Sequence, residues 1–317
     1  MQRQLPGLRW KPSWVSHLGC IEGCLDYLGI APSTAWLYGG TGHAFVLNIH
    51  QEGGPSGPTA WKAKPLFEHA PNLGYSVAGI LAFSTQPEYG EKVAQAWEMT
   101  RNAITGGLPC YAWEMELPEY YVITGYNDLG YLYNGPPTPD HAGLKPWRSL
   151  GGGGTGVLEC YRVLPGDPAD PAVTVRAALE FAVAFARNPD EWLLPRYTGG
   201  PAAYSTWAET ARAGNADDLG MRFNAAVWHQ CRAYATEFLA EAAEVLPCVR
   251  EHLLAASDAY RSVAVNLAEL SRLYSFPRDR TTPEPDRVTA AVELLTSCRV
   301  REEYGISLLE SLLAESF

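Results

Sequence analysis

Short apolar runs separated by turn residues fill the first half of the chain, a pattern typical of strands. They predict extended segments over 43–50, 75–84, 108–115, 119–126, 130–134 and 156–163. Helical spacing of apolar residues occurs over 17–29 and 88–103. Asn127, Asp128 and Gly130 favour a hairpin turn between two of the strands, because these residue types tolerate a left-handed backbone. The pattern predicts an α+β fold with an antiparallel sheet.

Amphipathic helical periodicity replaces this pattern beyond about residue 170, where Ala, Leu, Glu and Arg become frequent. The predicted helices cover 171–187, 201–213, 217–246, 248–274 and 285–315, with a linker from Pro277 to Pro285 before the last one. A break is expected near 165–170, since Asp170 can cap the helix that Pro171 opens. We therefore expect two domains, an α+β domain over 1–166 and an all-helical domain over 167–317.

Composition narrows the class of protein further. The 317 residues are 47% hydrophobic and 19% charged, as in globular proteins, which excludes a disordered or fibrous chain. No apolar run reaches the ~18 residues of a membrane span, and the amino terminus lacks the apolar core of a secretory signal. The net charge is -11 and Lys and Arg form no block, so neither nucleic acid nor a membrane is an expected partner. We expect a cytoplasmic protein.

Cysteine and glycine patterns exclude several kinds of site. The seven cysteines are odd in number and scattered, which does not suit a disulfide framework. Cys20 and Cys24 are four residues apart and so lack the CxxC spacing of zinc and redox sites. The histidines show no HExxH pattern, and the glycine runs 39–42 and 151–156 lack the Lys-Ser/Thr of a phosphate loop. The sequence predicts no metal ion and no cofactor.

Cys20 is the best candidate nucleophile, because it lies near the start of the first predicted helix. The positive end of a helix dipole favours the thiolate form of a cysteine. His17 precedes Cys20 by three residues and would share its helix face, so it is one candidate base. The alternative interpretation is that Cys20 and Cys24 are small buried residues of a core helix, since free cysteine is among the most buried residue types.

Three segments together resemble a known family. CIEGCL at 20–25 resembles the nucleophile helix of the papain-like cysteine peptidases that process bacteriocin leader peptides. EYYVITGYND at 119–128, followed by YLYNGP at 131–136, resembles their two-strand motif. The run from Cys20 to about residue 163 is more similar still to the amino-terminal domain family of butirosin biosynthesis protein H and its bacterial relatives. In that family the activity is acyl transfer from a carrier protein to an aminoglycoside.

The resemblance implies a papain-like fold for the first domain and an acyl intermediate on Cys20. It also shows departures, because Glu119 stands where the peptidase motif has its catalytic His and Gly135 where it has the orienting Asp. Two histidines could replace the missing base. His43 follows a flexible glycine loop and would form a Cys-His-Glu triad with Glu119 as the orienting residue. His17, on the same predicted helix face as Cys20, is the other candidate base.

Four residues are expected to line the substrate site: Trp14, Tyr120, Tyr121 and Asn134. Trp14 takes roughly the place of the glutamine that donates to an oxyanion in the peptidases. Glu119, with Tyr120 and Tyr121 beside it, would recognise an amine, because a carboxylate and aromatic faces both attract cations. The alternative is that Glu119 is a surface charge at a strand end and that the aromatic residues belong to the core.

Two functions follow from these observations. The first is an enzyme of the cysteine-dependent acyltransferase or hydrolase class, in which Cys20 attacks a thioester, ester or amide on a small molecule or a carrier protein. The second is a catalytically degenerate papain-like fold that binds a small molecule or a peptide. The helical domain would then serve as a lid or as the surface through which a homo-oligomer forms.

Overall fold

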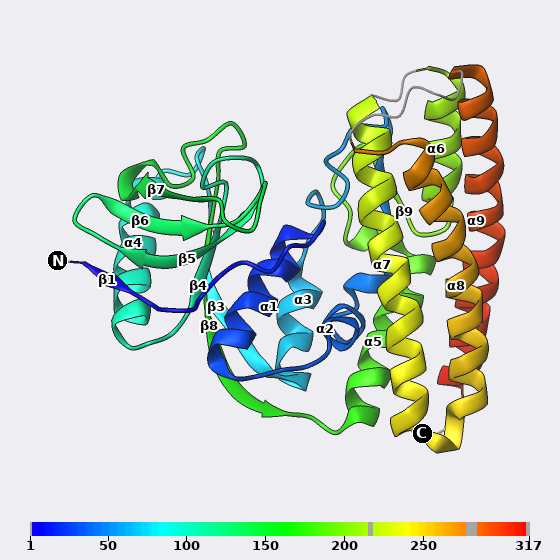
Figure 1. Ribbon diagram of the computed structural model, residues 1–317, viewed down its shortest axis with the longest axis horizontal. Coiled ribbons are helices and arrows are strands. Elements are labelled where there is room, and N and C mark those ends of the chain that lie inside the picture. The colour runs from blue at the N-terminus through cyan, green and yellow to red at the C-terminus, as the bar shows by residue number, and fades with distance from the viewer. Residues whose placement is uncertain (1, 215–217, 277–283, 315–317) are drawn as a thin grey trace. The chain divides into compact units, whose positions relative to one another are not determined.

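The computed structural model describes residues 2–214, 218–276 and 284–314 (Figure 1). The chain divides into two compact units. The first, here called the sheet unit, comprises Met1–Pro32 and Gly74–Pro168, and the second, the helical unit, comprises Ser33–Leu73 and Ala169–Phe317. The predicted linker from Pro277 to Pro285 falls largely on 277–283, outside the described residues.

A seven-stranded sheet forms the centre of the sheet unit. Its strands are β1 (Arg3–Gln4), β3 (Leu73–Phe83), β4 (Cys110–Trp113), β5 (Tyr120–Tyr126), β6 (Gly130–Asn134), β7 (Ala142–Pro146) and β8 (Val157–Pro168). The strand order is β3-β8-β4-β5-β6-β7. β6 pairs with β5 along one edge. Along the other edge, β4 pairs with the first half of β5 and β1 pairs with Gly125 and Tyr126 at its end. The predicted antiparallel sheet and the α+β class are confirmed.

Two helices, α1 (Ser16–Leu28) and α4 (Tyr89–Thr105), pack against this sheet. Successive side chains of a strand point to opposite faces. Cys160 of β8 contacts Thr100 of α4 at 3.2 Å between Sγ and Oγ1. Tyr111 of β4 lies on the other face, where its hydroxyl is 3.0 Å from Nε2 of His17 in α1. The amino end of α1 therefore lies over the face of the sheet opposite α4.

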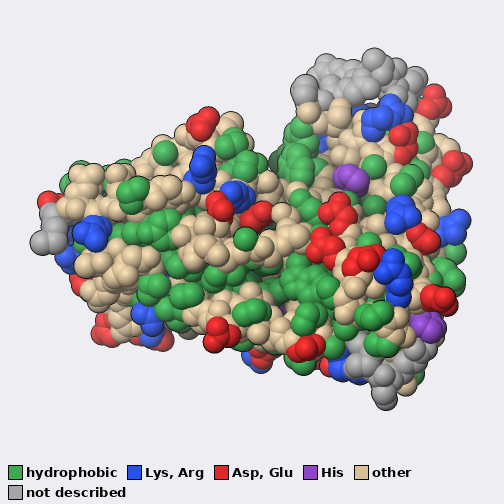
Figure 2. Space-filling view, turned by 60° about the horizontal axis from the view of Figure 1, so that its bottom comes forward, with side chains coloured by type: hydrophobic (Ala, Val, Ile, Leu, Met, Phe, Trp, Pro, Cys, Tyr) green, Lys and Arg blue, Asp and Glu red, His purple; other side chains and the backbone are tan. Residues whose placement is uncertain are grey.

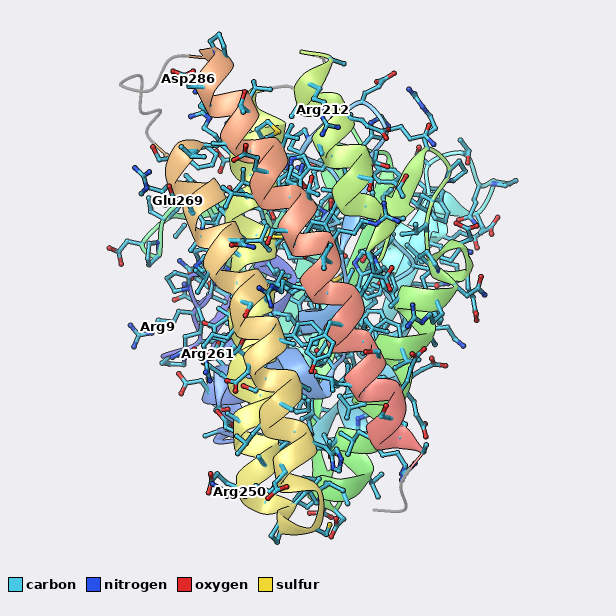
Figure 3. The ribbon with its side chains drawn as sticks, turned by 90° about the vertical axis from the view of Figure 1, so that its right-hand side faces the viewer. Arg9, Arg212, Arg250, Arg261, Glu269 and Asp286 are labelled. Carbon is cyan, nitrogen blue, oxygen red and sulfur yellow. The ribbon has the colours of Figure 1, made fainter. Side chains whose placement is uncertain are left out.

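The 3-10 helix η3 (Trp147–Ser149) completes the sheet unit, and the other elements belong to the helical unit. They are α2 (Thr34–Gly40), the 3-10 helices η1 (His43–Phe45) and η2 (Ala70–Asn72), β2 (Asn48–His50), α3 (Lys64–His69), α5 (Pro171–Arg187), η4 (Pro189–Glu191), β9 (Tyr197–Gly199), α6 (Ala202–Arg212), α7 (Asp218–Val245), η5 (Pro247–Val249), α8 (Arg250–Leu273) and α9 (Glu284–Leu313). The long helices α7, α8 and α9 pack in succession. Figure 3 shows α8 and α9 side by side, with Arg261 and Glu269 directed outward from α8. None of the described helices is both long and apolar enough to span a bilayer.

Charged side chains on the helical unit are mixed in sign. Figure 2 shows acidic and basic groups interspersed on this unit, with no continuous basic patch on the face in view. Several of these groups are neighbours on one helix, such as Arg261 with Asp258 and Arg272 with Glu269 on α8. Exposed pairs of this kind contribute little to stability, about 0–1 kcal/mol each.

The segment 33–73 groups with the helices, whereas the sequence predicted one domain over 1–166. Two contacts explain the difference. β2 pairs in antiparallel register with β9, for example Ile49 with Thr198, and α2 packs against α7. The approach of α2 to α7 requires glycine at position 39, because a Cβ there would lie 1.9 Å from the ring of Phe238. Segment 43–50 is accordingly not one extended run, since it begins with η1 and only its end forms β2.

A fully buried ion pair joins α7 and α9. The side chains of Arg232 and Glu302 are 0% and 2% exposed, with Nη2 and Oε1 2.6 Å apart. Nη1 of Arg232 also donates to the carbonyls of Ala44 and Val46, at 3.0 and 2.6 Å. Tyr204 of α6 donates its hydroxyl to Glu302 at 3.0 Å. One arginine thus connects segment 33–73 to the long helices.

We predict that Glu302→Ala lowers the free energy of unfolding by about 3–5 kcal/mol, because it leaves a buried guanidinium without its carboxylate. The measurement is denaturant unfolding followed by helical circular dichroism. Glu310→Ala is the matched control, since Glu310 pairs with Arg187 where both side chains are about 40% exposed, 39% and 43%. The control should lose less than about 1 kcal/mol. Equal losses in the two variants would contradict the prediction.

Candidate active site

Cys20 lies one turn inside α1 and is completely buried. The helix begins at Ser16, and the side chain of Cys20 is 0% exposed. Burial raises the pKa of the Cys20 thiol well above its ordinary value, and nearby Cys24 and Glu119 raise it further. The structure thus differs from the expectation of an open helix end carrying a thiolate, because the protonated thiol is the favoured form here.

Ser16 is the side chain that faces Glu119. Its Oγ donates a short hydrogen bond to Oε2 of Glu119 and accepts one from the backbone N–H of Tyr120 at 3.0 Å. Ser16 is the first residue of α1, and Glu119 directly precedes β5. The packing of α1 on β5 therefore brings together a hydroxyl and a carboxyl group that are 103 residues apart in the sequence.

The carboxyl group of Glu119 has an unusual pKa. Burial raises this pKa to about 7, although the hydrogen bond from Ser16 acts in the opposite direction. The group therefore exchanges its proton close to neutral pH. Its backbone is held by the loop before β5, because Glu119 N–H donates to the carbonyl of Leu117 at 2.7 Å and its own carbonyl accepts from Glu114 N–H at 2.8 Å. Glu114 adopts φ +56°, a left-handed conformation that is uncommon for a non-glycine residue.

The amino end of α1 carries the positive end of the helix dipole next to Ser16 and Glu119. Val15 precedes the helix, and its side chain makes no capping hydrogen bond. The first N–H groups of a helix have no partner within the helix, and the helix dipole makes this end attractive to negative charge. Hydroxyl, carboxyl and backbone donors thus converge at the start of α1.

His17 is held between two tyrosines. Its ring stacks on Tyr120, with centroids 4.0 Å apart and planes at 21°, and Nε2 is 3.0 Å from the hydroxyl of Tyr111. The residue is 6% exposed. The hydrogen bond between His17 and Tyr111 connects α1 to the sheet. The role of His17 as the base for Cys20 stays a prediction.

His43 belongs to the helical unit, whereas Cys20 and Glu119 belong to the sheet unit. The imidazole is 1% exposed and lies against the rings of Tyr38 and Trp61. Burial, with a contribution from Arg232, lowers the pKa of His43 to about 3, so the ring is neutral. Neither ring nitrogen has a hydrogen-bond partner within the described part of the chain. The hydrogen bond that the structure gives the Glu119 carboxylate comes from Ser16, in place of the predicted His43.

The two tyrosines of the predicted substrate site are tied into the sheet unit. Tyr120 donates its hydroxyl to Oε2 of Glu159 at 2.6 Å. The hydroxyl of Tyr121 accepts from the backbone N–H of Leu117 at 3.1 Å, and its ring meets that of Tyr133 edge to face. Both tyrosines are buried, which agrees with the alternative interpretation of these aromatics as core residues.

Asn134 uses both ends of its amide within the sheet unit. Its Oδ1 accepts from Trp10 N–H at 2.8 Å, and its Nδ2 donates to the carbonyls of Pro139 and His141, each at 2.8 Å. The side chain thereby fixes the chain before α1 and the loop after β6. Trp14, by contrast, is 42% exposed and lies two residues before Ser16, where it can contact a ligand.

Gly135 occupies a position that excludes a larger side chain. A Cβ at this residue would lie 2.5 Å from the ring of Tyr121, closer than real Cβ contacts. An aspartate cannot enter here without displacing that ring. Packing therefore excludes an acidic side chain at position 135.

Sequence reasoning missed Ser16. A serine at the first position of a helix is common for capping reasons alone, so the residue gives no signal of chemistry by itself. Its partner is identified only by the fold. The described residues contain no group of three or more His, Cys, Asp or Glu side chains that could hold a metal ion. Comparison of the chain with protein-family models and with curated proteins found no match.

We predict that Cys20 resists alkylation by iodoacetamide in the folded protein. Cys248 serves as the internal control, because it is the exposed one among the seven cysteines. Labelling at neutral pH followed by peptide mass spectrometry should find Cys248 modified rapidly and Cys20 modified only after unfolding, since both burial and a raised pKa suppress the thiolate. Rapid labelling of Cys20 at a pH well below the pKa of an ordinary thiol would contradict this prediction.

Proposed function

We propose that the protein catalyses acyl transfer or hydrolysis of a thioester, ester or amide, at the point where α1 meets β5 in the sheet unit. The observation that carries this proposal is the hydrogen bond between Ser16 and Glu119 at the amino end of α1. The arrangement supplies the parts that acyl chemistry needs: a hydroxyl nucleophile, a proton acceptor in contact with it, and backbone donors for an oxyanion.

The raised pKa of Glu119 supports its assignment as the general base. An ordinary glutamate, with a pKa near 4.3, is too weak a base to accept a proton efficiently at neutral pH. A base is most effective when its pKa lies near the working pH, and burial brings that of Glu119 to about 7. The substitution of His by Glu in the motif that the chain resembles is then compatible with catalysis.

The resemblance to the butirosin biosynthesis protein H family supports the same reaction class. In a papain-like fold the nucleophile lies on a helix and the base at the start of a strand of the sheet, and in our proposal Ser16 of α1 and Glu119 before β5 would take these two roles. The acyl donor would be a small molecule or an acyl group on a carrier protein. The net charge of -11 favours a cationic acceptor over an anionic one.

A second candidate function is a binding protein without catalysis. The complete burial of Cys20 favours it, because the cysteine-dependent reaction of the parent family needs an accessible thiolate. In this case Glu119 and the exposed ring of Trp14 would bind an amine-containing ligand.

We predict that the protein hydrolyses S-butyryl-N-acetylcysteamine and that Glu119→Gln slows this reaction about 10²–10⁴-fold, the range of general-base catalysis. Release of thiol is followed with a chromogenic disulfide. The wild-type rate should rise with pH, fall about tenfold for each unit below pH 7 and level off above it, because the base acts as the carboxylate.

Glu98→Gln is the matched control, since Glu98 is an exposed carboxylate on α4 that pairs with Arg101. It should leave both the rate and the pH profile unchanged. If the wild type shows no turnover that depends on Glu119, the catalytic proposal fails and the binding function stands in its place.

A further inference from the structure

We propose that Ser16, and not Cys20, is the nucleophile that carries the acyl group. This inference rests on the proposed function and identifies its catalytic residue. Ser16 is the side chain in direct contact with the carboxylate of Glu119, whereas Cys20 lies a turn further along α1 with its sulfur enclosed. A catalytic serine is recognised by such contact with a base.

The hydrogen bonds of Ser16 orient it for attack. Its hydroxyl proton points to Oε2 of Glu119, and one lone pair of Oγ accepts from Tyr120 N–H. One lone pair remains available for an incoming carbonyl carbon. Ser16 is 3% exposed, and Glu119 is partly exposed as a whole residue.

The base is held in place by the loop before β5. The backbone of Glu119 is fixed on both sides, by Leu117 and Glu114, and its carboxylate is held by the hydroxyl of Ser16. The Tyr120 N–H that contacts Ser16 comes from the next residue, which begins β5. Preorganised contacts of this kind are the main contribution a protein makes to such a reaction.

Acylation then proceeds in a balanced sequence. Glu119 takes the proton of the Ser16 hydroxyl while Oγ forms a bond to the thioester carbonyl carbon, and the oxyanion is stabilised by N–H groups at the start of α1. The C–S bond breaks, and the leaving thiolate takes the proton from Glu119. An ester on Ser16 and a free thiol result.

Deacylation reverses these roles. Water or an amine attacks the ester carbonyl and gives a proton to Glu119. The C–O bond to Ser16 breaks, and Oγ recovers the proton from the carboxyl group. The products are a carboxylic acid or an amide, and the enzyme returns to its starting state without any oxidant or cofactor.

Two substitutions decide between the nucleophiles. With S-butyryl-N-acetylcysteamine as the probe, Ser16→Ala should lose at least about 100-fold in rate, as expected when a nucleophile is removed. Cys20→Ala should still form the acyl-enzyme. Ser149→Ala is the matched control, because Ser149 is an exposed serine of the sheet unit whose hydroxyl bonds only locally, to the carbonyl of Pro146 at 2.8 Å. Circular dichroism verifies that each variant is folded.

The chemistry of the trapped intermediate gives a readout that a merely structural role of Ser16 would not change. Butyrylated wild type should carry an ester that withstands neutral hydroxylamine and is cleaved by alkaline hydroxylamine. Ser16→Cys should carry a thioester that neutral hydroxylamine cleaves, with fragment-ion mass spectrometry placing the acyl group on residue 16.

The possible results separate the two proposals. If the wild type hydrolyses the thioester but the acyl group is found on Cys20, or if Ser16→Ala keeps its full rate while folded, the assignment of Ser16 is wrong and the acyl-transfer function stands. If the wild type neither turns over nor becomes acylated, the proposed function itself fails.

Discussion

One hydrogen bond, from the hydroxyl of Ser16 to the carboxylate of Glu119, fixes the junction of α1 and β5 on which the proposed reaction depends. It joins the first residue of a helix to the residue that opens a strand in the middle of the sheet, so it exists only when α1 is packed on β5. The same packing removes water from the carboxyl group and brings its pKa to about 7. The packing of α1 on β5 therefore causes both the contact between Ser16 and Glu119 and the raised pKa of Glu119.

Burial has the opposite consequence for the thiol and the imidazole that the sequence singles out. A thiolate is a charged form, so the enclosure that raises the pKa of Cys20 removes its nucleophilic species. An imidazole gains its charge on protonation, and enclosure therefore lowers the pKa of His43 to about 3. Carboxyl burial is the one case of the three that moves a group toward neutral pH. The physical environment thus favours Glu119 as the proton acceptor of the site.

Local sequence signals predict elements well and long-range grouping poorly. The helix predicted over 171–187 has these bounds because Asp170 caps it, accepting from Ala172 N–H at 2.8 Å, and Pro171 begins it. The placement of segment 33–73 with the helices depends instead on the pairing of β2 with β9, which no local pattern reveals. Ser16 was missed for the same reason, since its partner is distant in sequence. Cys20 was predicted from its residue type and its place near the start of a helix, and neither of these reports burial.

The proposed reaction would link the departures at Glu119 and Gly135 from the motif that the chain resembles. An imidazole base has two tautomers and must be oriented by a third group, which is the task of the acid in a Cys-His-Asp site. A carboxylate has two equivalent oxygens and no tautomer to select, so it needs only a fixed backbone, and the loop before β5 supplies this through Leu117 and Glu114. With a carboxylate as the base, the reaction would need no orienting acid. The place of that acid can then be occupied by the ring of Tyr121, which packs against Gly135. A serine hydroxyl, which does not ionise before attack, suits such a base, because the proton moves directly to the carboxylate as the new bond forms.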